Sequence, residues 1–393
     1  MTDLLYTGVE DDLRRSVRDM LAQRSPVSRV LAHCEGGEAY DAALWRVVAA
    51  DMGLAGLLVP ERHGGAGAGP REAAVVLEEL GRQVAPVPYL GSAVVATTAL
   101  GALDAPGGSG DGAGGLLAAL AGGGTVAALA VPFDTPPGGP ALTVTASGAG
   151  PSGQALPSGQ VGLSGRVRGV ADALAADTLL VPTGAGLYRV AADAPGVARS
   201  PVLSLDLTRP LCDLAFDGAP GTLLAGGDDA EGDDAGGDDA GRAVAAALTA
   251  GAALLASEQL GVAEWCLETT VAYVRTRHQF GRPVGSFQAL KHRLADVWVD
   301  VTQARAAARY AAACLADGDP DAPVATALAQ AHCSLVAVRA AEECVQLHGG
   351  IGFTWEHPAH LFLKRARADA AGFGAPERHR SALATLADLP APH

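Results

Sequence analysis

The sequence contains very little lysine and no long basic stripe. Only Lys291 and Lys364 are lysines among 28 Lys and Arg residues, and the formal net charge is −15. Proteins that bind nucleic acids use clustered Lys and Arg side chains to neutralise phosphates. The scarcity of such clusters therefore argues against nucleic acid as a partner.

Long apolar runs and cysteine motifs are also missing. No stretch approaches the ~18 consecutive apolar residues of a typical membrane-spanning helix, and the opening MTDLLYTGVEDDLRR has early acids and no signal-peptide core. We therefore expect a cytoplasmic protein without a membrane span. None of the six cysteines has CxxC spacing, which argues against a zinc ribbon, a redox motif or a disulfide framework. Buried, reduced thiols are the expectation.

Several common catalytic motifs are absent as well. The sequence has no GxSxG elbow and no HExxH motif, so neither Ser-His-Asp hydrolysis nor a catalytic zinc site is indicated, and no metal is expected. Residues 110–115 and 148–153 match GxGxxG literally. A dinucleotide-binding loop must follow a strand and open a helix, and neither segment has these neighbours. We interpret both as chance matches.

The residues that are present divide the chain into four stretches. Residues 1–124 have the apolar periodicity of helices, and residues 125–225 hold short strand-like runs separated by Gly, Pro and Ser. Residues 226–242, GGDDAEGDDAGGDDAGR, have the composition of a solvated or disordered linker. Residues 243–393 are strongly helical again. The pattern predicts a helical domain, a small antiparallel β domain and a C-terminal helical bundle.

Individual elements follow from the same periodicities. Helices are predicted at 41–52, 70–80, 243–277, 286–311 and 323–347. Strands are predicted from the runs VAALAVP, ALTVTAS, DTLLVP, GLYRVAA and LCDLAF.

Two C-terminal segments are much more specific than these patterns. They read YVRTRHQFGRPVGSFQALKHRLADV (273–297) and QLHGGIGFTWEHPAHLFLKRARAD (346–369). Together with LWRVVAADMGLAGLLVPERHGGAG (44–67), they make the chain resemble the acyl-CoA dehydrogenase family. The resemblance implies a mostly α fold with a central β domain, in which the C-terminal domain is a four-helix bundle. It also implies FAD as cofactor.

The residues of these segments suit a bound dinucleotide. Arg277 supplies a permanent charge opposite a diphosphate, Gln279 and Gln288 offer amide hydrogen bonds, and Phe280 offers an apolar surface. A helix is expected to end at the segment Gln346-Leu347-His348-Gly349-Gly350, which we call the 346–350 corner. Its glycines can bring backbone amides close to a phosphate. Taken singly, a GG pair after a helix is more often a C-cap, and a terminal Arg usually complements the helix dipole.

By family resemblance, these residues serve one flavin at a subunit interface. Arg277, Phe280 and Gln288 would hold the FAD of a neighbouring subunit, and the 346–350 corner would hold it from across the interface. The resemblance therefore implies a homo- or hetero-oligomer, either a dimer or a tetramer.

The catalytic base of the family is missing from its usual places. The family removes an α-proton from an acyl thioester with a glutamate while a hydride leaves the β-carbon for the flavin. Phe373 stands where most members carry that glutamate, and Gly251 stands at the alternative position on the long helix. Glu258 is two turns from Gly251 on the same helix face, ~10 Å along the axis, and is a candidate substitute. A structural glutamate is the competing interpretation.

Three functional hypotheses follow from the resemblance. The chain is an FAD-dependent oxidoreductase that desaturates an acyl thioester, bound to coenzyme A or a carrier protein, with electron transfer flavoprotein as electron acceptor. Alternatively, it is a subunit whose partner chain supplies the base, or it is a non-catalytic, structural partner. In the third hypothesis, the fold performs other flavin chemistry, such as oxygenation or biosynthetic desaturation.

Overall fold

The computed structural model describes residues 4–104, 112–148, 150–151, 154, 156–227 and 238–388. Most of the expected linker at 226–242 lies outside these residues. The chain separates into two compact units. The first comprises Met1–Gly37, Pro70–Pro86 and Ala252–His393, and the second comprises Glu38–Gly69 and Val87–Gly251.

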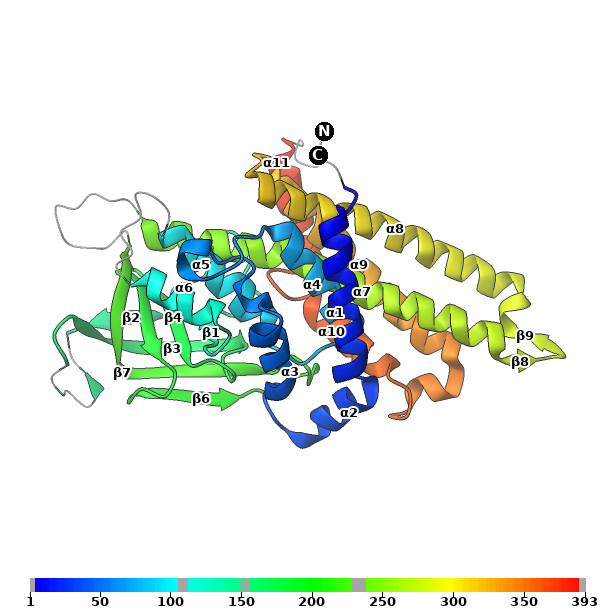
Figure 1. The fold of residues 1–393 in the computed structure, drawn as a ribbon, viewed down its shortest axis with the longest axis horizontal. Helices are drawn as coiled ribbons and strands as arrows, with labels where there is room; N and C mark the ends of the chain where they lie inside the picture. Colours follow the sequence, from blue (N-terminus) through cyan, green and yellow to red (C-terminus); the bar gives the residue numbers. More distant parts are fainter. Residues whose placement is uncertain are drawn as a thin grey trace, which may run out of the picture. The chain divides into compact units, whose positions relative to one another are not determined.

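The first unit is built from long helices (Figure 1). Its elements are α1 (Gly8–Arg24), α2 (Val27–Gly36), α4 (Pro70–Arg82), α7 (Asp239–Thr276) from residue 252 onward, β8 (His278–Gln279), β9 (Arg282–Pro283), η6 (Val284–Ser286), α8 (Gln288–Asp317), α9 (Ala322–His348), η7 (Gly349–Phe353), α10 (Ala359–Asp369) and α11 (Pro376–Leu386). The three long helices expected at 243–277, 286–311 and 323–347 are thereby confirmed. Helix α7 begins earlier than expected because the Asp238 carboxylate accepts a hydrogen bond from the Gly241 amide at 2.6 Å.

Small side chains let the long helices of this unit pack closely. The buried core of α8 and α9 is mostly alanine and cysteine, including Ala304, Ala308, Ala329 and Cys333. By length and hydropathy, α7 and the segment 322–353 could each cross a membrane. In the fold, however, 72% and 67% of the most apolar 18-residue stretch of each is buried. Their apolar character is therefore that of core helices.

Helices α4 and α7 cross so closely that Gly261 has no room for a side chain. A Cβ atom at Gly261 would lie 1.9 Å from the Glu78 carbonyl oxygen. We expect Gly261→Ala to lower the free energy of unfolding by about 1–3 kcal/mol, because the helices must separate. Gly101→Ala is the control: a Cβ there meets nothing within 4 Å, so the helix should gain about 0.5–1 kcal/mol. Urea unfolding of both variants measures the difference, and equal effects would contradict the packing argument.

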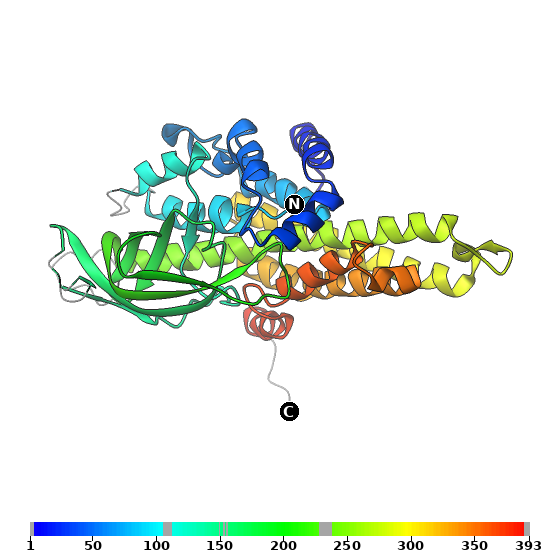
Figure 2. The ribbon, with the colours of Figure 1, turned by 90° about the horizontal axis from the view of Figure 1, so that it is seen from below.

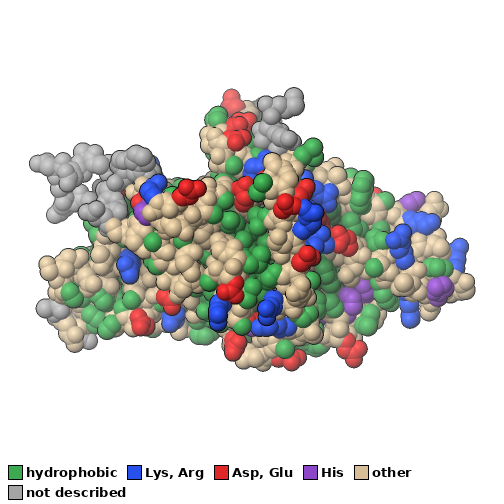
Figure 3. All heavy atoms as spheres, in the orientation of Figure 1, with side chains coloured by type: hydrophobic (Ala, Val, Ile, Leu, Met, Phe, Trp, Pro, Cys, Tyr) green, Lys and Arg blue, Asp and Glu red, His purple; other side chains and the backbone are tan. Residues whose placement is uncertain are grey.

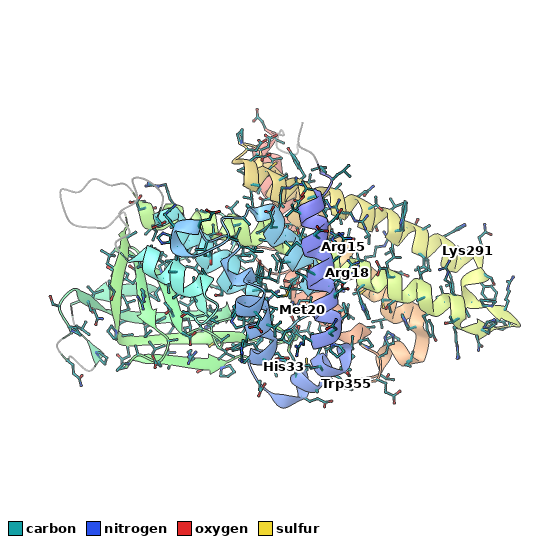
Figure 4. All side chains as sticks on the ribbon, viewed as in Figure 1. Arg15, Arg18, Met20, His33, Lys291 and Trp355 are labelled. Carbon is teal, nitrogen blue, oxygen red and sulfur yellow. The ribbon has the colours of Figure 1, made fainter. Side chains whose placement is uncertain are left out.

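A buried network of ion pairs joins α1, α4, α7 and α8. Arg14 contacts Glu78 and Arg18 contacts Glu79, each at 2.6 Å, so α1 is fixed to α4. Arg18 is labelled on α1 in Figure 4. On α7, Glu264 accepts from Arg82 at 2.9 Å and from Arg305 at 2.7 Å. Buried carboxylates are costly unless paired, so each of these arginines offsets the desolvation of a glutamate.

The second unit combines short helices with the β-sheet. Its elements are α3 (Ala42–Arg46), the π-helix η1 (Val47–Asp51), η2 (Leu54–Gly56), η3 (Glu61–His63), the π-helix η4 (Tyr89–Ala96), α5 (Thr97–Leu103), α6 (Ala113–Ala121), β1 (Ala127–Leu129), β2 (Val144–Ser147), β3 (Gln160–Ala171), β4 (Thr178–Thr183), β5 (Gly186–Ala191), β6 (Val197–Pro201), β7 (Leu211–Gly226) and α7 up to residue 251. Helices α5 and α6 lie on one side of the sheet (Figure 2).

The sheet is mixed, whereas the sequence predicted an antiparallel one. Its strand order is β1-β4-β5-β7-β3-β2, with β6 also paired to β7. Strand β1 pairs with β4 in parallel, and the other pairs are antiparallel. Strands β3 and β6 were not predicted from the sequence. Strand β3 has three valines but also three glycines, which weaken the strand pattern, and Gly165 lies at a register shift. The mostly α fold with a central sheet domain is confirmed.

Candidate functional site

The chain direction in the bundle brings two distant sequence segments to the same end. Helices α8 and α9 are connected by a short turn, and α7 and α8 by the hairpin β8–β9 with η6. The chain therefore runs up, down and up, so that the C-terminal ends of α7 and α9 lie at the same end of the bundle. Figures 1 and 2 both show the hairpin at this end of the three helices.

An open hollow of about 660 Å³ lies at this end. We call it the α7–α9 hollow. Its lining residues are Tyr273, Arg277, Gln279, Val284, Leu290, Arg293, Gln346, Leu347, His348, Gly349, Gly350 and Ile351. Arg277 and the 346–350 corner therefore meet within one chain. The up-down-up order joins them, and which subunits contribute to one flavin stays a prediction.

Two of the predicted cofactor residues do not line the hollow. Phe280 is 90% exposed at the tip of the β8–β9 hairpin, where its φ of 53° places it in the left-handed region. Gln288 is the exposed first residue of α8. Both face away from the chain's own core, so a role toward a neighbouring subunit's FAD stays a prediction.

Tyr273 and Arg293 line the hollow but were not predicted. The Tyr273 ring stacks on His348 with centroids 4.4 Å apart. Arg293 pairs with Glu343 at 2.8 Å, which holds α8 to α9 beside the hollow. The i, i+4 spacing from Tyr273 to Arg277 was a usable signal, because residues four apart share one helix face.

The hollow has a local excess of positive charge that the net charge of the chain conceals. Between residues 269 and 295 there are five Lys and Arg residues and no Asp or Glu. On the face drawn in Figure 3, Lys, Arg and His side chains gather at this end, and Lys291 is labelled there in Figure 4. The Arg277 guanidinium is exposed and makes no ion pair with any residue that the structure describes. It is therefore available to an anion.

The glycines of the corner leave backbone open toward the hollow. Gly349 ends α9 with φ 64° and ψ −141°, a conformation that only glycine adopts readily. A Cβ atom on Gly349 or Gly350 would meet nothing within 4 Å. Packing inside this chain therefore does not require glycine at 350, whereas Gly352 is required because its Cβ would lie 2.4 Å from the Val345 carbonyl. The space over Gly350 suits a group that approaches the backbone.

His348 forms a rigid wall of the hollow. Its Nδ1 donates to the Cys344 carbonyl at 2.6 Å, and its ring stacks between Tyr273 and His357, whose centroid is 4.1 Å away. Burial opposes the charged form of His348, but the hydrogen bonds with Cys344 outweigh it and raise its pKa. Burial, with the charges of His348 and His360, lowers the pKa of His357 to about 4.

No carboxylate occupies either usual base position. Phe373 is buried with φ 52°, and Gly251 is a buried residue of α7. The Glu258 carboxylate is 1% exposed and accepts a hydrogen bond from Arg365 at 2.5 Å. The Arg365 guanidinium therefore offsets the desolvation of this buried carboxylate. The arrangement favours the structural interpretation of Glu258.

The described residues include no group of three or more His, Cys, Asp or Glu that could hold a metal. All six cysteines are free thiols, and Cys34 alone among them is not fully buried.

Comparisons with known proteins agree with the fold and the motifs. Residues 7–106 match the acyl-CoA dehydrogenase N-terminal domain, and residues 239–386 match the acyl-CoA dehydrogenase C-terminal domain. Acyl-CoA dehydrogenase IpdE2 of Mycobacterium tuberculosis is 34% identical over 358 residues, which is 91% of each chain.

Two solved structures share the whole architecture. The ChsE4–ChsE5 complex from Mycobacterium tuberculosis aligns with a TM-score of 0.82 at 28% identity, over 99% of this chain and 100% of the matched chain. A Tcur3481–Tcur3483 steroid ACAD variant aligns with a TM-score of 0.79 at 27% identity, over 96% and 97%. This chain therefore belongs to the acyl-CoA dehydrogenase family, whose members are oxidoreductases.

Proposed function

We propose that the α7–α9 hollow binds the diphosphate of FAD. Arg277 would supply the charge, Gln279 and Gln346 would supply amide donors, and the backbone at Gly349–Gly350 would approach the phosphate oxygens. The residues present fit this group, because an unpaired guanidinium and open glycine backbone are what a phosphate requires. When bound, the flavin supplies the hydride acceptor of the reaction.

We further propose that the chain works as one subunit of a heteromeric acyl-CoA dehydrogenase. One observation carries this proposal. Positions 373 and 251 hold Phe373 and Gly251, which have no carboxylate, and the carboxylate of Glu258 is bound by Arg365. Removing an α-proton from an acyl thioester needs a positioned base. A second, related chain would supply that base, and two structures similar to this chain carry the names of two proteins each.

Three exposed aromatic side chains of the helical unit support a partner surface. Phe280, Phe353 and Trp355 are all exposed, and large exposed apolar side chains are a feature of interaction sites. Phe280 is also held with positive φ, although it gains no burial in this chain. A cytoplasmic oligomer, in which a neighbouring chain or its flavin covers these rings, accounts for both features.

The proposal predicts that this chain alone does not oxidise acyl thioesters. The chain would be purified alone and together with a related chain that carries the family glutamate. Each sample would be mixed anaerobically with straight-chain and steroid-linked acyl-CoA, and flavin bleaching would be recorded. Bleaching only in the mixed complex is expected, with preference for the steroid thioester that one similar structure suggests. Electron transfer flavoprotein would then serve as the test acceptor.

The partner's glutamate provides the control. Its replacement by glutamine should abolish bleaching but leave the flavin content of the complex unchanged, because the base does not hold the diphosphate. Rapid bleaching of this chain alone would overturn the heteromeric proposal. Consumption of NADH and oxygen would point to an oxygenase instead.

A further inference from the structure

One ring nitrogen of His348 is left over on the wall of the α7–α9 hollow. The other nitrogen, Nδ1, donates to the Cys344 carbonyl at 2.6 Å, so that edge of the ring is turned back onto α9. The two ring faces are stacked against Tyr273 and His357. Nε2 has no hydrogen-bond partner among the residues that the structure describes. Because His348 lines the hollow, the end of the ring that carries Nε2 is the part that remains to face it.

These contacts fix which nitrogen of His348 carries the proton in the neutral ring. A neutral imidazole has one N–H group and one lone pair, and a backbone carbonyl can only accept. The proton therefore lies on Nδ1, which donates to Cys344, and Nε2 presents a lone pair toward the hollow. A lone pair repels a phosphate oxygen. Only the doubly protonated ring can donate from Nε2 while it keeps the hydrogen bond to Cys344.

The neighbouring His357 is held in the opposite tautomer. Its Nδ1 accepts a hydrogen bond from the Ala359 amide at 3.2 Å, at the start of α10. A proton on this Nδ1 would break that bond, and the ring centroids of His357 and His348 are only 4.1 Å apart, so charge on both rings is unfavourable. Burial, with the charges of His348 and His360, lowers the pKa of His357 to about 4. A proton taken up by this pair therefore goes to His348.

The other charged groups around His348 set when it takes up this proton. Burial opposes the charged form of His348, but the hydrogen bonds with Cys344 on α9 outweigh it and raise its pKa. On α7, Arg277 lines the same hollow, and its positive charge opposes a second cation in the free protein. On α8, Arg293 is paired with Glu343 at 2.8 Å. An anion that contacts Arg277 reverses this balance, because it also attracts positive charge to His348.

We propose that His348 is a proton-linked ligand for a diphosphate in the α7–α9 hollow. When the diphosphate binds, Nε2 takes up a proton from solvent and donates to a phosphate oxygen, while Nδ1 keeps its bond to the Cys344 carbonyl. This inference rests on the proposed binding of FAD in the hollow, and it adds that the affinity depends on pH. Diphosphate binding and proton uptake favour each other, since one electrostatic contact stabilises both.

The expected pH dependence follows from this linkage. At low pH, His348 is already charged in the free protein, so the affinity for a diphosphate is constant. As the pH rises through the pKa of His348 in the free protein, formation of the complex requires uptake of a proton, and the affinity falls by up to about tenfold per pH unit. The fall ends above the higher pKa that His348 has in the complex.

Calorimetry of the protein, alone and in its complex with a second chain, tests the proposal. After removal of any bound flavin, FAD and ADP-ribose are titrated at several pH values in buffers of different ionisation enthalpy. Both ligands carry a diphosphate that is esterified at each end, so their phosphates do not titrate near neutral pH. The difference in binding heat between buffers counts the protons taken up. We expect uptake to approach about one proton per ligand where the affinity falls, and to vanish at lower pH.

Two variants assign the proton to His348. His348→Gln has no titrating ring, so its affinity for FAD should not vary over this pH range and its proton uptake should disappear. His292→Gln is the matched control, because His292 is an exposed histidine of α8 that does not line the hollow. Proton uptake in this control should equal that of the unchanged protein.

The outcomes separate this inference from the proposed function. FAD binding that is weakened by Arg277→Gln but involves no proton uptake would overturn the role of His348 alone. Proton uptake that persists in His348→Gln would also overturn it, because the proton would then belong to another group. If neither FAD nor ADP-ribose bound at any pH, the proposed diphosphate site would be overturned as well.

Discussion

Replacing Arg277 with glutamine is expected to weaken FAD binding by about 10- to 100-fold. A hydrogen bond to a charged group contributes about 1.5–3 kcal/mol, and each ~1.4 kcal/mol changes a binding constant tenfold. Arg277 has no ion-pair partner among the described residues and lines the α7–α9 hollow. Its loss therefore removes binding energy without leaving a buried charge unpaired. Titration of flavin fluorescence, on the chain and on its complex with a second chain, measures the change.

Arg275→Gln is the matched control for this experiment. Arg275 is also an exposed arginine at the end of α7, but it does not line the hollow. Its replacement removes the same charge from the same region and should change FAD affinity less than threefold, because only long-range attraction is lost. Equal weakening by both variants would show that general charge, and not contact in the hollow, accounts for the effect.

Replacing Arg365 with methionine is expected to cost about 3–5 kcal/mol of unfolding free energy. The substitution leaves the Glu258 carboxylate buried without its guanidinium, and breaking a buried ion pair from one side has this magnitude. Both side chains are nearly inaccessible, at 2% and 1% exposure. Urea unfolding followed by tryptophan fluorescence measures the loss, since Trp265 packs in the same helical unit.

The double variant Glu258→Gln/Arg365→Met tests the cause. Removing both charges should recover much of the stability lost in Arg365→Met, because position 258 then holds a neutral amide and not a buried carboxylate without its guanidinium. Glu258→Gln alone should also be destabilising. If Glu258 were the catalytic base, Glu258→Gln would instead leave stability unchanged and abolish turnover in the assembled enzyme. That outcome would contradict the structural interpretation.

Periodicity predicted the helices well because it reports which face of a segment is buried. The predicted helix at 70–80 is observed at Pro70–Arg82, and the one at 323–347 at Ala322–His348. Strand β3 was missed because its three glycines interrupt the strand pattern, and its pairing with β2 and β7 completes the strand. The parallel pairing of β1 with β4 was missed for a related reason: short runs indicate strands but not their direction.

The family resemblance of two segments identified seven residues of the α7–α9 hollow, from Arg277 and Gln279 to the 346–350 corner. It missed Tyr273 and Arg293, although both lie in the 273–297 segment; they enter the hollow through packing on His348 and pairing with Glu343. Phe280 and Gln288 were predicted from the same motif, but neither lines the hollow of this chain.

By itself, the sequence determined which chemical groups the chain possesses. It placed phenylalanine at 373 and glycine at 251, so neither position can accept a proton, and it put Arg277 and a diglycine at two helix ends. Only the tertiary structure decided which of these groups meet. The up-down-up course of α7, α8 and α9 joined the two helix ends into one hollow. Folding also buried Glu258 against Arg365, a residue 107 positions away. Such long-range pairs depend on how helices pack, which local periodicity does not encode.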